Sequence, residues 1–252
     1  MELTEVEFWD DYWKGCRLPS TIDEGFSFDR CLAKELRRHL TGLSGSALEI
    51  GCAPGRWMAL LHELGLVPSG IEYSMAGADI TVKNLNMLNV KYGEIMRGDF
   101  LSIMPDRLFD VVLSLGFIEH FDDPDPVISR HLEWLKPGGI LVIGVPNFMG
   151  INGLLQKAVD RPVLERHNRA VMSMDYFNRV SNLFSLRIKF LGYIGSFEPA
   201  LPMSTRGWKG ATASVIRVSL GLMRRVRKIR ALDKANSRFF SSYILAVYLK
   251  GA

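Results

Sequence analysis

The sequence contains only three cysteines, and they lie far apart. Cys16, Cys31 and Cys52 form no Cys-x-x-Cys pair. Disulfide frameworks and structural zinc sites both depend on regularly spaced cysteines. The sequence therefore predicts neither, and it shows no cluster of residues spaced to bind a metal ion.

Long hydrophobic runs are also missing. No stretch approaches the roughly 18 consecutive apolar residues that a membrane-spanning helix requires. The first residues, Met1-Glu2-Leu3-Thr4-Glu5, are acidic and lack the basic start and apolar core of a signal peptide. We therefore expect a cytoplasmic protein, with peripheral contact at the inner face of a membrane as an open alternative.

Acidic residues are almost absent from the last fifty positions. Residues 203–252 contain 11 Lys and Arg and one acid, Asp233, for a net charge of +10, whereas residues 1–202 carry −6. Within this segment, residues 215–230 combine apolar side chains with six basic ones. That mixture is typical of a basic amphipathic helix.

Several interpretations of the basic segment 215–230 remain open. It can be a solvated helix packed on the body of the protein or a contact in a homodimer. It can also bind an anionic membrane surface or an anionic substrate. RNA is a further alternative, but no aromatic stacking motif accompanies the charge.

Residues 47–57 form the most informative stretch of the chain. Their sequence, Ala-Leu-Glu-Ile-Gly-Cys-Ala-Pro-Gly-Arg-Trp, predicts a short buried strand, a turn between Gly51 and Gly55, and the start of a helix. Free N–H groups at a helix start favour a negatively charged ligand. The dinucleotide pattern Gly-x-Gly-x-x-Gly fits poorly, because Ala53 and Arg56 occupy two of its glycine positions.

Two further predicted strands end in polar residues. Residues 69–74 predict a strand that ends near Glu72, at the position where nucleotide-binding α/β folds bind ribose hydroxyls. Residues 111–115 predict a central buried strand, followed by Glu119 and His120. Ligands bind at the carboxyl ends of parallel strands, so we expect these side chains near one site.

Periodicity and capping residues also predict the other elements of the chain. We expect helices over residues 4–14, 27–40, 55–64, 75–88, 122–136 and 173–184, and strands over residues 94–97, 140–145, 185–194 and 241–249.

Together these features resemble the class I S-adenosylmethionine (SAM) methyltransferases. The glycine turn is similar to motif I of that family, with Ala53 in place of its middle glycine. The strand followed by Glu119 and His120 is similar to motif IV of small-molecule and ubiquinone-type methyltransferases. Residues 135–139, Leu-Lys-Pro-Gly-Gly, are similar to a turn found in the family. The resemblance covers residues 47–146.

The resemblance implies an α/β, Rossmann-like class I methyltransferase fold. Its mostly parallel sheet would have seven strands in the order 3-2-1-4-5-7-6, helices on both faces and an added cap. The 252 residues fit a single domain of this kind. We expect N-terminal helices in residues 1–40, a SAM-binding core in 41–146, a substrate cap in 147–184, and a basic insertion in 195–240.

The first N-terminal helix is rich in aromatic residues. Residues 4–14 place Phe8, Trp9, Tyr12 and Trp13 at helical spacing. These rings can pack the helix onto the body of the protein. Alternatively they can form a lid over a bound ligand, as in many SAM methyltransferases, and the sequence leaves both interpretations open.

The resemblance implies SAM as the cofactor and S-adenosylhomocysteine as its product. Glu72 would accept hydrogen bonds from the ribose hydroxyls and Asp99 from the adenine amino group, while Phe100 would pack on the adenine ring. The cofactor-binding positions implied by the resemblance are Glu49, Gly51, Cys52, Ala53, Gly55, Trp57, Glu72, Tyr73, Ser74, Gly98, Asp99, Phe100, Leu115, Gly116 and Phe117.

The sequence therefore predicts an enzyme that transfers the methyl group of SAM to an oxygen, nitrogen or carbon atom of a small molecule or glycan. One alternative is an RNA methyltransferase, although residues 115–118 lack an Asn-Pro-Pro-Tyr-type motif. Another alternative is a catalytically inactive, SAM-binding partner subunit.

His120 is the candidate catalytic residue. It follows the fourth strand, and a neutral imidazole with a reference pKa of about 6.5 can accept the proton of a hydroxyl acceptor. The alternative is that His120 only shapes the SAM pocket. His167, Tyr176 and Tyr193 are reserve candidates from segments expected to cover the pocket. We expect no metal ligands.

Overall fold

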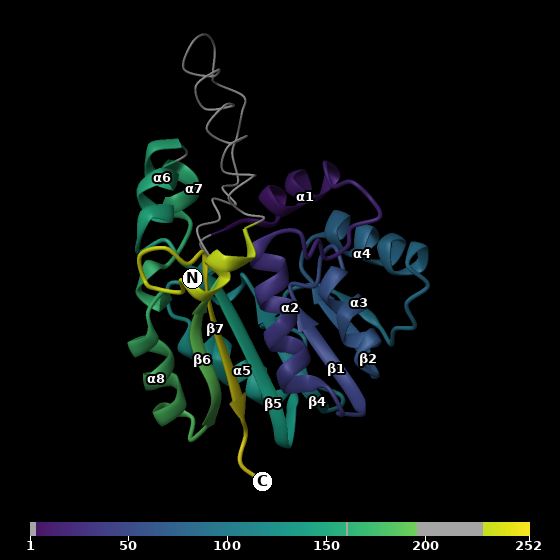
Figure 1. Ribbon diagram of the computed structural model, residues 1–252. Helices are drawn as coiled ribbons and strands as arrows, with labels where there is room; N and C mark the ends of the chain where they lie inside the picture. The colour runs from purple at the N-terminus through teal and green to yellow at the C-terminus, as the bar shows by residue number, and fades with distance from the viewer. Residues whose placement is uncertain (1–3, 160, 196–228) are drawn as a thin grey trace.

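A seven-stranded sheet lies at the centre of the protein, with helices against both faces (Figure 1). The computed structural model describes residues 4–159, 161–195 and 229–252. The strand order is β3-β2-β1-β4-β5-β7-β6, which confirms the fold and the order that the resemblance implies. The strands span Gly45–Ile50 (β1), Leu66–Glu72 (β2), Ile95–Arg97 (β3), Phe109–Leu115 (β4), Leu135–Pro146 (β5), Arg187–Ile194 (β6) and Tyr243–Leu249 (β7).

Strand direction places the carboxyl ends of the parallel strands at one edge of the sheet. β1 pairs in parallel with β2 and β4, and β4 pairs in parallel with β5. β7 runs antiparallel to β5 and β6, between which it lies. The carboxyl ends of β1, β2 and β4 therefore meet on the side where α1 lies, at the top of Figure 1.

The helices connect the strands and cover both faces of the sheet. The α-helices span Val6–Lys14 (α1), Ser27–Leu40 (α2), Arg56–Glu63 (α3), Met75–Met87 (α4), Asp125–Glu133 (α5), Ile151–Val159 (α6), Arg161–Glu165 (α7) and Met174–Leu183 (α8). The short 3-10 helices span Ile118–His120 (η1), Arg169–Val171 (η2) and Arg230–Lys234 (η4).

β4 shows why the central strands are mainly hydrophobic. Successive side chains of a strand point to opposite faces of the sheet. Val111 and Leu113 pack against the face covered by α2 and α3, whereas Val112 packs against the face covered by α5 and α8. Because both faces are covered, most positions are apolar, and the buried Ser114 has a hydrogen-bond partner in His131.

Most predicted elements match the structure within a few residues, but one boundary is wrong. The helix predicted to run to residue 136 is α5, which ends at Glu133. Leu135 already pairs with Phe109 of β4, and the backbone N–H of Phe109 donates to the Trp134 carbonyl oxygen at 2.8 Å. Because Leu135 pairs with β4, β5 begins at this residue, and residues 135–139 form the first part of that strand.

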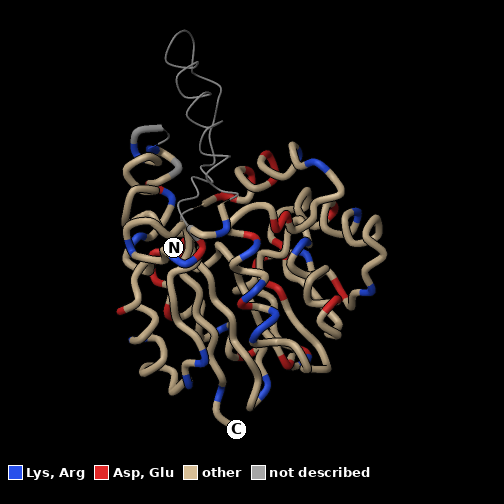
Figure 2. The backbone as a smooth tube through the Cα atoms, in the orientation of Figure 1, with Lys and Arg blue, Asp and Glu red and all other residues tan. Residues whose placement is uncertain are grey.

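The basic stretch 215–230 lies outside the described residues, apart from its last two positions. Seven of the chain's Lys and Arg residues fall within 196–228. Over the described surface, basic and acidic residues are interspersed (Figure 2). Among the described residues, no helix has both the length and the apolar character needed to cross a membrane.

A buried hydrogen bond of Tyr248 connects α8 to the sheet. This β7 side chain is fully buried, and its hydroxyl donates to the Phe177 carbonyl oxygen of α8 at 2.8 Å. We expect Tyr248→Phe to lower the free energy of unfolding by about 1 kcal/mol, because it removes one buried hydrogen bond. Urea denaturation measures this change. Tyr92→Phe is the control, since its hydroxyl bond is exposed, and equal effects in both variants would contradict the prediction.

Candidate active site

A cavity of about 460 Å³ lies at the carboxyl ends of β1, β2 and β4, beneath α1. Its size is typical of a site for a small molecule or cofactor. Most of the predicted cofactor-binding residues line it. They are Glu49, Gly51, Ala53, Trp57, Glu72, Tyr73, Gly98, Asp99, Phe100, Leu115, Gly116 and Phe117.

The glycine turn and the end of β2 meet at the Glu72 carboxylate. Its two oxygens accept hydrogen bonds from the Ala53 N–H at 3.1 Å and the Ser74 N–H at 3.0 Å. Burial raises the pKa of Glu72, and these backbone hydrogen bonds oppose the rise. Gly51 adopts a positive φ of 70° in the turn, and an added Cβ would lie 3.3 Å from the Phe117 ring.

Three of the predicted positions do not line the cavity. The Cys52 side chain is buried against Gly70, where an added Cβ would lie 2.5 Å from its sulfur. The Ser74 hydroxyl caps α4 by accepting the Gly77 N–H at 2.9 Å. Gly55 caps α3 with a φ of 85°. These residues shape the turn and the helix starts around the cavity.

Helix packing requires a glycine at position 55. An added Cβ would approach Thr81 and Leu85 of α4 at 3.1 to 3.3 Å. Close packing between α3 and α4, together with the positive φ, therefore favours this glycine.

α1 lies over the cavity and contributes aromatic rings to its wall. Trp9, Tyr12 and Trp13 line the cavity, and none of the helix's residues is buried. The Asp10 carboxylate fixes α1 to the start of α4 by accepting the Ser74 hydroxyl at 2.5 Å and the Ala76 N–H at 3.1 Å. α1 thus packs on α4 and lines the cavity at the same time.

Charged groups stand at the end of the cavity nearest to α3. Glu49 is 3% exposed, and its Oε2 atom has no hydrogen-bond partner among the described residues. Burial raises the pKa of Glu49 well above its usual value, while the nearby Arg56 guanidinium opposes this. Arg56 also lines the cavity, where it pairs with Asp29 at 3.1 Å and stacks on Trp57.

Asp99 and Phe100 follow β3 at the opposite wall. Asp99 accepts hydrogen bonds from the Leu101 N–H at 2.9 Å and the Ser102 hydroxyl at 2.8 Å, which orders this turn. The Phe100 ring is nearly buried and makes edge-to-face contacts with Phe117 and His131. Phe100 is therefore a fixed apolar wall.

His120 lies where the sequence predicts, beside the end of β4. It lines the cavity, and only 7% of its surface is exposed. Burial lowers the pKa of His120 to about 3, and the neighbouring His167 adds to this effect. General bases act best when their pKa is near the working pH. A pKa of about 3 makes the His120 ring a weak base near neutral pH.

The three reserve candidates lie in different surroundings. The His167 ring lies 4.8 Å from that of His120, measured between ring centroids. Tyr176 instead contacts Asp125 through its hydroxyl at 3.4 Å, and Tyr193 lies on β6. Neither tyrosine lines the cavity. Burial raises the pKa of both tyrosines, so they are poorly suited to lose a proton.

Sequence reasoning missed some residues of the cavity wall. Arg56, Phe121, Cys16 and Ser20 line the cavity but belong to no motif. Cys16 and Ser20 come from the connection between α1 and α2, and only the folded chain brings that connection to the sheet. For Arg56 a signal existed, since it directly follows the glycine turn.

The fold and site agree with comparisons to known proteins. A family model described as a methyltransferase domain matches residues 27–187, which is more than half of the chain. The chain therefore belongs to the methyltransferase domain family, within the class I SAM-dependent methyltransferases.

Sequence relatives and solved structures are consistent with this assignment. A ubiquinone biosynthesis O-methyltransferase from Pseudomonas fluorescens is 35% identical over 103 residues, which is 39% of this chain and 43% of that protein. This chain thus matches less than half the length of that curated relative.

Among solved structures, geranyl diphosphate C-methyltransferase from Streptomyces coelicolor A3(2) has a TM-score of 0.64 at 14% identity, covering 97% of both chains. That structure contains Mg²⁺, geranyl diphosphate and S-adenosyl-L-homocysteine. A SAM-dependent methyltransferase from Archaeoglobus fulgidus has a TM-score of 0.57 at 18% identity, covering 98% of this chain and all of that one. At these identities, both likenesses concern the fold alone.

His131, beneath the cavity wall, makes stability depend on pH. It is fully buried, its Nδ1–H donates to the Val127 carbonyl at 2.7 Å, and its Nε2 accepts from the Ser114 hydroxyl at 3.0 Å. Burial lowers the pKa of His131 to about 4. Between that pKa and about 6.5, the unfolded chain binds more protons at this residue than the folded chain does.

We therefore expect His131 to contribute a loss of stability as the pH falls from about 6.5 to 4, by up to about 1.4 kcal/mol per pH unit. In His131→Gln this contribution disappears, so the free energy of unfolding should vary less steeply with pH. Urea denaturation at pH 4.5, 5.5 and 6.5 measures both slopes. Glu119, whose raised pKa acts in the opposite direction, is common to both proteins. Identical slopes would contradict the prediction.

Proposed function

We propose that this protein transfers the methyl group of SAM to a small molecule or glycan and releases S-adenosylhomocysteine. One observation carries the proposal. The glycine turn and the Glu72 carboxylate meet at the wall of a single cavity, at the carboxyl ends of β1, β2 and β4. In open α/β sheets this edge is where nucleotide-like ligands bind.

The adenosine part of SAM would lie at the carboxyl ends of β2 and β3. Glu72 already accepts two backbone N–H groups, yet carboxylate oxygens have further lone pairs that can accept from the ribose hydroxyls. Asp99 and Phe100 line the same wall, which suits an adenine ring and its amino group. The sequence's assignment of these three residues is thus consistent with their positions.

The amino-acid part of SAM would lie near Glu49 and Arg56. A buried carboxylate oxygen without a hydrogen-bond donor is costly, and an ammonium group would compensate it. The ammonium of SAM has the required charge, and Arg56 carries the charge that attracts its carboxylate. The two ends of an amino acid therefore match the two charges at this end of the cavity.

Methyl transfer needs little from the protein besides positioning and exclusion of water. The acceptor atom forms a bond to the methyl carbon as the carbon–sulfur bond breaks, and a hydroxyl acceptor loses its proton. Holding two reactants in line can lower the barrier by about 7–11 kcal/mol in favourable cases. The rings of Trp9, Tyr12 and Trp13 cover the cavity and would keep water from the sulfonium.

The end of the cavity away from Glu49 and Arg56 indicates which acceptor would fit. Phe117, Phe121 and His120 line that end, so a mainly apolar acceptor with one or two polar groups fits it. The Pseudomonas relative, named as a ubiquinone biosynthesis O-methyltransferase, supports an oxygen atom as the methylated position. We therefore favour a hydroxylated small molecule over RNA.

Calorimetry with SAM, together with measured release of S-adenosylhomocysteine, tests the function. We expect the unmodified chain to bind SAM and to release its product in the presence of hydroxylated small molecules. Failure to bind either SAM or S-adenosylhomocysteine would overturn the proposal. SAM binding without turnover on any acceptor, in a stable complex with another protein, would favour an inactive partner subunit.

Glu72→Ala tests the ribose assignment. We expect SAM to bind about 1.5–3 kcal/mol more weakly, or roughly tenfold to 150-fold, because hydrogen bonds to a charged acceptor are lost. Calorimetry on the folded variant measures the change. Glu94→Ala is the matched control, since Glu94 is an exposed glutamate in the loop between α4 and β3, where it pairs with Arg107. Unchanged affinity in Glu72→Ala would remove Glu72 from the site.

A further inference from the structure

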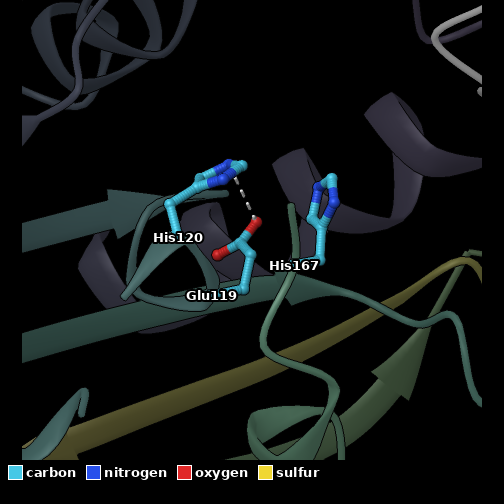
Figure 3. A group of neighbouring side chains, drawn as sticks. All are labelled: Glu119, His120 and His167. Carbon is cyan, nitrogen blue, oxygen red and sulfur yellow. Dashed lines mark ion pairs between the residues drawn. The ribbon is translucent and has the colours of Figure 1, made fainter. Parts of the chain in front are cut away.

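Three potential metal ligands converge beside the acceptor end of the cavity. Glu119 and His120 belong to η1, and His167 lies between α7 and η2. One ligand atom from each residue lies within 4.8 Å of the other two. Figure 3 shows the Glu119 carboxylate between the two imidazole rings. We propose that Glu119, His120 and His167 bind one divalent transition-metal ion, such as Zn²⁺.

The spacing suits a cation after a small contraction. The Glu119 Oε1 atom lies 4.0 Å from His120 Nε2, which is beyond hydrogen-bond distance. Ligands about 2.1 Å from a zinc ion lie roughly 3.4 Å apart in a tetrahedral site. The cluster is therefore slightly more open than a filled site, and small rotations of the three side chains would bring their ligand atoms to that spacing.

The hydrogen bonds of His120 prepare its ring for a metal. Its Nδ1 atom lies 3.1 Å from the Thr4 hydroxyl, which can accept or donate, and 3.3 Å from the Arg166 carbonyl oxygen, which can only accept. A proton on Nδ1 satisfies both contacts. The Nε2 atom is then left with a lone pair, on the side that faces Glu119. Metal-binding histidines usually donate their other ring N–H to a carbonyl or carboxylate in this way.

One oxygen of the buried Glu119 carboxyl group lacks a partner. It is 1% exposed, and its Oε2 atom has no hydrogen-bond partner among the described residues. A buried carboxylate without a donor or cation is strongly unfavourable. Arg166 directly precedes His167 in the chain. Its guanidinium packs on the Phe8 ring, 4.4 Å from the ring centroid.

The backbone around His167 is firmly attached to η1. The Asn168 N–H donates to the Glu119 carbonyl at 2.6 Å, and the Asn168 side-chain amide donates to the carbonyls of Phe121 and Asp122 at 3.0 Å each. Arg166 is tied to His120 on the other side. His167 is therefore held between two anchored neighbours, as a ligand that must stay in place requires.

The donor set indicates which ions the site would take. Two imidazoles and one carboxylate favour Zn²⁺, Fe²⁺, Co²⁺ or Ni²⁺ over Mg²⁺ and Ca²⁺, which prefer oxygen ligands. Of the three ligands, His120 lines the cavity, so an ion bound to it would lie beside the acceptor end. This role rests on the proposed function. A bound ion would coordinate the acceptor oxygen, so that its hydroxyl releases a proton to water as the methyl–oxygen bond forms.

The test is a titration of the chelator-treated, full-length protein with Co²⁺ and Zn²⁺, without SAM or acceptor. We expect one ion per chain, with a visible absorption band for Co²⁺. His167→Gln and Glu119→Gln should each weaken binding at least tenfold, since removing even an outer partner of a metal site costs that much. The matched control is His39→Gln, because His39 also lies beside a glutamate, Glu35, at 3.6 Å, but without a third ligand.

Two results would overturn the metal site. One is absence of a bound ion in the unmodified protein at millimolar Co²⁺ and Zn²⁺, which would mean that Glu119 is neutralised by a proton. The other is unchanged affinity in His167→Gln, which would place the bound ion elsewhere. His167 is half-buried, so we expect His167→Gln to fold even if Glu119→Gln does not. The metal affinity of His167→Gln then tests the site by itself. SAM affinity, measured separately on metal-free protein, distinguishes failure of this inference from failure of the proposed function.

Discussion

The arrangement of the site depends on how the Glu72 carboxylate joins two parts of the sheet edge. By accepting N–H groups from Ala53 and Ser74, it connects the glycine turn after β1 to the end of β2 and the start of α4. A buried carboxylate needs such donors to remain charged. The cavity wall is therefore ordered without a ligand, and less of the binding free energy is spent on ordering it.

The same region also positions α1. Asp10 binds the hydroxyl of Ser74, the residue whose N–H bonds to Glu72. The absence of a side chain on Gly77 allows Trp13 and Glu72 to approach each other, since an added Cβ would lie 2.8 Å from the Trp13 ring and 3.0 Å from the Glu72 carboxyl carbon. The covering helix therefore lies directly against the wall of the cavity.

The sequence predicts the sheet well because its signals are local. Hydrophobic strands, the glycine turn and the acid at the end of β2 each occupy a few consecutive residues, and the strand order follows from the resemblance. Contacts between distant segments are not predictable in this way. The sequence shows no metal-ligand spacing because His167 joins Glu119 only through the fold. Likewise, Cys52 and Ser74 lie within the right motifs, but their side chains point into packing and a helix cap.

The exposed character of α1 has a kinetic consequence. No residue of this helix is buried, and α4 is its main contact among the described helices and strands. An element with so little buried area can separate from the body at a small cost in free energy, while the sheet stays folded. Exchange of a bound ligand therefore requires only this helix to move. The lifetime of a complex would then be governed by the opening rate of α1, and not by the stability of the domain.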